Sequence, residues 1–268
     1  MAFTPFLDDL GLIEVILLLA AAVLAYGGVM AWWAIRTNDP KGLRGVLRGM
    51  AVPLGALGVT TTVLALWGEM TWPFLSSDGM GGYNIFFFDV LFLMGLVLLA
   101  YAISAYLSLR LQFAGLFAFI AGGVTLFYGW TGYTATPAFT KDPFDTLLLY
   151  AGFGLAGILS LPATVIVDYY LARVDALRAP WSVTHVVAAP RPRAMGARAA
   201  QPVVAARAGT PSPPAEAPVT VVRYRVPLWV QSLMLVFPVM MALAGIAALW
   251  YFGVTLPGHL GNGPGSAP

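Results

Sequence analysis

Long apolar stretches separated by short polar segments dominate this chain. A membrane-spanning helix needs about 20 consecutive, mostly apolar residues. The stretches that meet this length are residues 10–35, 49–72, 84–109, 111–134, 143–170 and 227–254. The pattern therefore predicts an all-α integral membrane protein with six transmembrane helices.

Composition supports the same class. Hydrophobic residues make up 59% of the chain and charged residues 10%, whereas soluble domains carry about 25% charged residues. A fold in water could not cover this much apolar surface, so lipid must be part of the solvent.

The basic residues predict the orientation of the spans. Fourteen Lys and Arg residues occur in the chain. All but Lys141 fall between spans one and two, three and four, or five and six, and so on one side of the membrane. Cytoplasmic loops carry an excess of Lys and Arg. We therefore expect a multi-pass protein of the cell (plasma) membrane with its N- and C-termini both outside the cytoplasm.

The stretch 174–226 differs in composition from the rest of the chain. It is rich in Pro, Ala and Arg and lacks the apolar residues needed to build a core, so it is expected to be a disordered cytoplasmic linker. Its arginines could contact anionic lipid. The predicted organisation is a five-helix membrane domain at 1–173, this linker, a sixth transmembrane helix at 227–256, and a flexible external tail at 257–268.

An internal repeat is suggested by two similar stretches. Residues 58–73 begin with Gly-Val-Thr and end with Thr-Trp-Pro, and residues 123–137 begin with Gly-Val-Thr and end with Ala-Thr-Pro. Phe88-Asp89 and Phe144-Asp145 then open the next spans. The copies share one orientation, so they predict a central four-helix bundle around a pseudo-two-fold axis, with spans one and six at its margin. The repeated hairpins would be 49–109 and 111–170, with Asp89 and Asp145 as symmetry mates.

Acidic residues inside the spans are the first candidates for chemistry. Ionisable groups in a membrane are costly and default to functional hypotheses. Together the four acidic residues named below could form an outward-facing pocket for a proton, a hard cation such as Ca²⁺ or a cationic group. The alternative is structural, with the aspartates capping helices and the glutamates reaching the interface. The candidates are Glu14, Glu69, Asp89 and Asp145.

Metal ligands are sparse. The chain has no Cys and two His, which excludes disulfides and thiolate sites and argues against a bis-histidine haem in the membrane core. His185 falls in the linker and is expected to be solvated. Met70, Met80 and His259 share the predicted outer side and could hold copper, although Met is also ordinary core filling. No metal site is predicted from them.

Aromatic residues cluster at the predicted outer interface, where amphipathic rings favour the headgroup level. Three of them, Trp130, Tyr133 and Tyr128, could equally line a slot for a quinone. No Gly-x-Ser-x-Gly, His-Glu-x-x-His or phosphate-loop motif occurs, so no catalytic residue and no cofactor of its own is predicted. Lipid is expected to bind, and a quinone is a further option. The aromatic candidates are Trp72, Tyr83, Trp130 and Tyr133.

Three short motifs resemble the signature of a family of prokaryotic polytopic membrane proteins, the domain-of-unknown-function 981 family. They are Met70-Thr71-Trp72-Pro73, Tyr83-Asn84-Ile85 and Phe87-Phe88-Asp89, and Ala156-Gly157-Ile158-Leu159 also resembles the close of the family's fifth span. The resemblance covers roughly residues 10–170 and departs at Val90, where the family pattern has Pro. It implies an architecture and an outer loop packed over the bundle by Trp72 and Tyr83, but no activity.

Three functions are compatible with these features. The preferred one is an accessory, non-catalytic subunit of a larger membrane complex, for example a respiratory one, because the chain lacks redox ligands and has glycine-rich helix faces that suit close helix packing. Its partners would be other membrane subunits and membrane lipids, and no nucleic acid. The alternatives are a small-cation or proton carrier that uses the outward acids, and a quinone- or lipid-binding membrane enzyme. The glycine-rich faces include Gly27-Gly28, Gly122-Gly123 and Gly152 to Gly157.

Overall fold

The computed structural model describes residues 9–71, 85–134, 143–178 and 226–261, and no strand occurs in these segments. Six helices in these segments are long and apolar enough to cross a membrane, which confirms the predicted number of spans. One span begins as a short π-helix, η2, that continues directly into α4. The elements are α1 (Asp9–Arg36), α2 (Pro40–Thr71), η2 (Ile85–Asp89), α4 (Val90–Tyr106), α5 (Gln112–Thr134), α6 (Pro143–Arg178) and α7 (Leu228–Gly261).

Several helices extend beyond the apolar stretches that predict them. α2 begins at Pro40 rather than at residue 49, because the Asp39 carboxylate accepts the backbone N–H of Gly42 at 2.9 Å and caps the helix. Proline suits the first helical position that follows such a cap. α6 continues to Arg178, so the stretch predicted as linker from residue 174 begins within a helix; residues 179–225 lie outside the described part.

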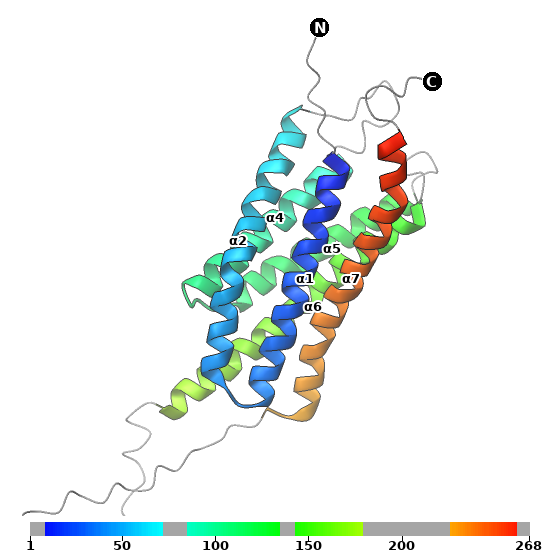
Figure 1. The fold of residues 1–268 in the computed structure, drawn as a ribbon. Coiled ribbons are helices and arrows are strands. Elements are labelled where there is room, and N and C mark those ends of the chain that lie inside the picture. Colours follow the sequence, from blue (N-terminus) through cyan, green and yellow to red (C-terminus); the bar gives the residue numbers. More distant parts are fainter. Residues whose placement is uncertain (1–8, 72–84, 135–142, 179–225, 262–268) are drawn as a thin grey trace, which may run out of the picture.

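The helices close a ring in which each packs on its neighbours, in the order α1, α2, α4, α5, α6, α7 and back to α1. In Figure 1, α2, α1 and α7 form one layer in front of α4, α5 and α6. The outer surface carries large apolar side chains such as Val52, Phe113 and Ile246, which are 74%, 67% and 64% exposed. An apolar outer surface of this kind suits contact with lipid chains.

The predicted central four-helix bundle differs from this ring. Helices α2, α4, α5 and α6 form an open arc, and α1 and α7 bridge its two ends. The first and last spans are therefore parts of the ring wall and not additions at its margin. This arrangement does not confirm the predicted pseudo-two-fold axis.

The two predicted hairpins nevertheless share one close contact. A Cβ on Gly58 would meet the backbone of Leu99 and Gly95, and a Cβ on Gly122 would meet the backbone of Ile158 and Gly154 in the same way. Gly58 thus corresponds to Gly122, not to Gly123 as the Gly-Val-Thr alignment suggests. In this register Asp89 corresponds to Leu148, about one helical turn from Asp145, so the contact does not confirm the two aspartates as mates.

Side-chain contacts join the helix ends on the side of the basic residues. The Asp168 carboxylate of α6 accepts the backbone N–H groups of Leu111, just before α5, and of Gln112, its first residue, at 3.0 and 2.8 Å. The Tyr170 hydroxyl donates to Asn38 Oδ1 in the α1–α2 turn at 3.0 Å. Arg44 of α2 forms an ion pair with Asp175 of α6. These contacts gather the basic residues of three separate segments at one end of the ring, which we call the basic end.

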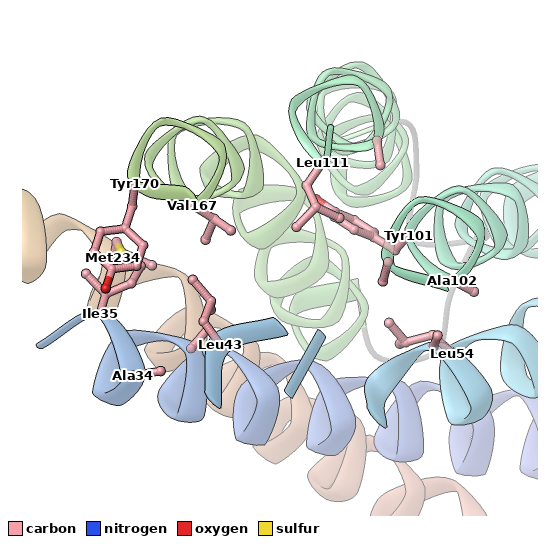
Figure 2. Packing of buried hydrophobic residues seen from close by; sticks show 14 of the residues in the cluster. Ala34, Ile35, Leu43, Leu54, Tyr101, Ala102, Leu111, Val167, Tyr170 and Met234 are labelled. Atoms are coloured by element: carbon pink, nitrogen blue, oxygen red, sulfur yellow. The ribbon is translucent and has the colours of Figure 1, made fainter. Parts of the chain in front are cut away.

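Apolar side chains from every helix fill the half of the ring nearest the basic end. Figure 2 shows Tyr170 of α6, Ile35 of α1 and Met234 of α7 together at one corner of this core. Tyr101 extends from α4 toward Leu111, which precedes α5. The core therefore joins elements far apart in the sequence and fixes the side chains that line the cavities described below.

Candidate functional site

Two of the four acidic candidates meet beside a tyrosine. The Tyr128 hydroxyl of α5 donates to Asp89 Oδ2 at 2.6 Å. The Glu69 carboxyl of α2 lies near the same aspartate, and its Oε1 atom is buried without a hydrogen-bond partner. The cluster brings together two of the four acids of the predicted pocket.

The other two acids lie elsewhere in the ring. Glu14 of α1 is buried, with 3% of its surface exposed, and lines a cavity between the helices. Asp145 lies half-buried in the first turn of α6, where a negative charge suits the helix N-terminus.

Asp89 does not cap the third span, which contradicts the structural alternative for that residue. Its backbone is helical, with φ −58° and ψ −49°, and its side chain makes no capping hydrogen bond. The helix starts earlier, at Ile85, as the π-turn η2. The Asp89 carboxylate is instead held by Tyr128 across the interface with α5.

The remaining sequence candidates do not form a site within the described residues. Met70 is 84% exposed on α2. Trp130 and Tyr133 pack ring to ring on the surface, with centroids 6.2 Å apart, and do not line the cavity. Within the described segments, no group of three or more His, Asp or Glu side chains that could hold a metal occurs. Trp72, Met80, Tyr83, His185 and the side chain of His259 lie outside the described part.

A cavity of about 110 Å³ lies inside the ring, between α1 and the layer of α4, α5 and α6, with α7 closing one side. A second cavity of about 80 Å³ adjoins it toward the basic end and also touches α2. Leu24, Tyr101, Ser160 and Phe237 line both, so these four residues form the partition between them. The walls are otherwise largely apolar. The polar residues of the larger cavity are Glu14, Tyr101, Thr125, Tyr150, Ser160 and Tyr251.

Most of the wall hydroxyls are occupied by the protein itself. Thr125 donates to the carbonyl of Ala121 at 2.9 Å and Ser160 to that of Gly157 at 2.5 Å. The Tyr101 hydroxyl is buried near Ser160 but makes no hydrogen bond of normal geometry. Burying a polar group without a partner costs about 1–3 kcal/mol. Tyr101 is therefore the wall group that a bound molecule could satisfy.

Sequence reasoning did not identify this cavity. The possible slot residues Trp130, Tyr133 and Tyr128 do not line the cavity, and Phe87, Tyr150 and Phe153 contribute aromatic rings to its wall instead. The sequence feature that could have indicated this cavity is a hydroxyl-bearing residue near the middle of a span. Polar groups at that depth favour the bundle interior, and both Tyr101 and Ser160 lie there.

Comparison with known proteins places the chain in a family. No curated protein and no solved structure matches it. A family model with the description "Protein of unknown function (DUF981)" matches residues 1–189. The match spans α1 to α6 and ends before α7, although α7 contributes Phe237, Met241 and Tyr251 to the cavity wall. Since the match covers well over half of the chain, the protein belongs to the DUF981 family.

Proposed function

We propose that this protein binds an apolar molecule of the lipid or isoprenoid-quinone class within the membrane. The observation that carries the proposal is the pair of adjoining cavities with the unpartnered Tyr101 hydroxyl on their shared wall. Small-molecule sites are mostly apolar, with a few polar groups that fix orientation. These cavities have that character.

The chemistry of the wall narrows the ligand class. A phenolic hydroxyl can donate one hydrogen bond, which suits a quinone carbonyl or the ester oxygen of a lipid. The surrounding walls offer aliphatic and aromatic contacts to a hydrocarbon chain. We place the basic end in the cytoplasm, with both termini outside it, because the described basic residues gather there and cytoplasmic loops are rich in Lys and Arg.

Filling the larger cavity tests the proposal. Ala121 lines this cavity and Ala22 is exposed on the outer face of α1. We expect Ala121→Leu to lower the lipid or quinone retained after mild detergent extraction at least about tenfold, which corresponds to about 1.4 kcal/mol of binding free energy. The readout is mass spectrometry of a solvent extract of the purified protein.

The matched control is Ala22→Leu, which adds the same atoms on the lipid-facing side and should leave the retained amount unchanged. Equal retention by wild type and both variants would place the molecule outside the cavity and contradict the proposal. So would the absence of any lipid or quinone at near-stoichiometric amounts in the wild-type extract.

A second candidate function, an accessory subunit of a membrane complex, for example a respiratory one, is favoured by the outer face of α2. Small residues are exposed there at helical spacing, and a Cβ on Gly45 or Gly49 would meet nothing within 4 Å. Small-residue faces let membrane helices approach closely. The small residues of this face are Gly45, Gly49 and Ala56, and Val52 is exposed beside them.

If this face holds a partner subunit, Gly49→Leu should remove a co-purifying membrane protein that wild type retains in mild detergent. Gly123→Leu is the matched control, because Gly123 is also exposed and has open space around it. Quantitative mass spectrometry of the purified material gives the comparison. A wild-type monomer with no co-purifying protein would count against the accessory role.

A further inference from the structure

A polar groove of about 530 Å³ opens at the basic end, between the start of α2, the α4–α5 turn and the last turns of α6. Three arginines from two separate segments line it, together with two acids of α6. The charged residues of the groove are Arg44, Arg48, Arg110, Asp168 and Asp175.

The two acids are already engaged, and they leave part of the positive charge unbalanced. Asp175 forms the ion pair with Arg44, and Asp168 accepts the two backbone N–H groups at the entry to α5. Arg48 donates to the neutral hydroxyl of Ser108 at 3.3 Å. Arg110 has no ion-pair partner among the described residues. Two guanidinium groups in the groove therefore lack a carboxylate partner in this part of the chain.

The groove continues into the apolar interior. Leu47, Ala105 and Leu111 line both the groove and the smaller cavity. That cavity in turn adjoins the larger one across the partition at Tyr101. A cationic mouth thus leads to an apolar space inside the ring.

We infer that this groove binds the phosphate head group of an anionic lipid, and that one chain of the lipid enters the cavities; the inference rests on the function proposed above and names its ligand class. Guanidinium groups bind phosphate oxygens through paired, charge-assisted hydrogen bonds. Basic pockets between transmembrane helices on the cytoplasmic side suit such head groups. A free phosphate would leave the adjoining apolar space unused, which favours the lipid.

Charge removal from the groove tests the head-group contact. The full chain in detergent would be titrated with dioleoyl phosphatidylglycerol, dioleoyl phosphatidylcholine and inorganic phosphate, and binding followed by native mass spectrometry. We expect wild type to prefer phosphatidylglycerol, and R48Q/R110Q to weaken that binding roughly ten- to thirty-fold, from about 1 kcal/mol per basic residue. K41Q/R173Q removes the same charge from the same end, outside the groove lining, and should change binding less than about threefold.

Three results would overturn the inference while leaving the proposed function intact. They are equal binding of the two lipids, equal losses in both double variants, and competition by inorganic phosphate that matches the lipid in strength. By contrast, failure of the proposed function would appear as a lack of effect of Ala121→Leu on every apolar ligand.

The position of the chain is tested by photochemistry. A phosphatidylglycerol with a diazirine at the end of one chain should label cavity residues such as Tyr101, Phe237 or Met241 in wild type, and the labelling should fall in R48Q/R110Q. Labelling confined to outer, lipid-facing residues such as Phe113 would show that no chain enters the ring.

Discussion

Replacing Gly122 with Val is expected to prevent stable assembly of the α5–α6 pair. A Cβ at this position would lie 2.5 Å from the carbonyl oxygen of Gly154 and 2.9 Å from the backbone nitrogen of Ile158. Backbone atoms cannot rotate away as side chains do, so the helices must separate. Overpacking typically costs about 1–3 kcal/mol, and we expect Gly122→Val to lower the free energy of unfolding by about 3 kcal/mol. Van der Waals contact between helices is a main source of stability inside lipid. The substitution therefore weakens one of the interfaces on which the stability of the fold depends.

Gly123 offers a matched control one residue away. A Cβ there would meet nothing within 4 Å, and the residue is exposed to the lipid side. Gly123→Val should change stability by less than about 0.5 kcal/mol. Thermal unfolding in detergent, followed by size-exclusion chromatography of the soluble fraction, compares the two variants. Similar melting temperatures for both would contradict the close packing of α5 on α6.

These neighbouring glycines show what the sequence could and could not predict. The six spans were predictable because hydropathy is a local property that any transmembrane helix must satisfy. The grouping of basic residues at one end follows from the alternation of spans. Gly122 and Gly123, however, differ only in the direction each faces, and that depends on the rotation of α5 against α6. The one-residue error in the repeat alignment has this cause.

The same reasoning explains why the cavity was missed. Tyr101 and Ser160 are ordinary members of apolar spans in the sequence, and their meeting depends on how α4 and α6 pack on α5. The acidic cluster was predictable only in part. The sequence indicates Glu69 and Asp89 as site residues, but not the hydrogen bond that Tyr128 donates to Asp89. Hydropathy reports the depth of a residue in the membrane, and the partner it meets is set by tertiary packing.

The family match and the cavity together suggest a division of roles within the ring. Residues 1–189 carry α1 to α6, which provide most of the cavity wall, and α7 lies outside that match. Yet α7 packs closely on α1 and α6, with Gly28 against Pro238 and Gly152 against Ala244. The family segment thus supplies most of the cavity wall, and α7 completes the enclosure.

The second large effect is expected from Tyr150, which holds the π-turn at the start of the third span. Its hydroxyl donates to the carbonyl of Phe86 at 2.7 Å, and its ring stacks on the Phe86 ring at a centroid distance of 4.7 Å. Gly129 of α5 lies directly against its Cβ. π-Helical turns are rare, so this one is expected to depend on outside support. Tyr150 supplies both a hydrogen bond and a packing surface to it.

Tyr150→Ala should therefore lower the free energy of unfolding by about 3–5 kcal/mol, the range for large-to-small aromatic substitutions. Tyr150→Phe keeps the ring and removes the hydrogen bond, at about 1 kcal/mol. Equilibrium unfolding in detergent gives both values, and hydrogen exchange at residues 85–92 should quicken in each variant. Equal losses in the two variants would assign the support to the hydroxyl alone. A loss below about 1 kcal/mol in Tyr150→Ala would show that the turn, and with it the placement of Asp89 beside Tyr128, is held by other contacts.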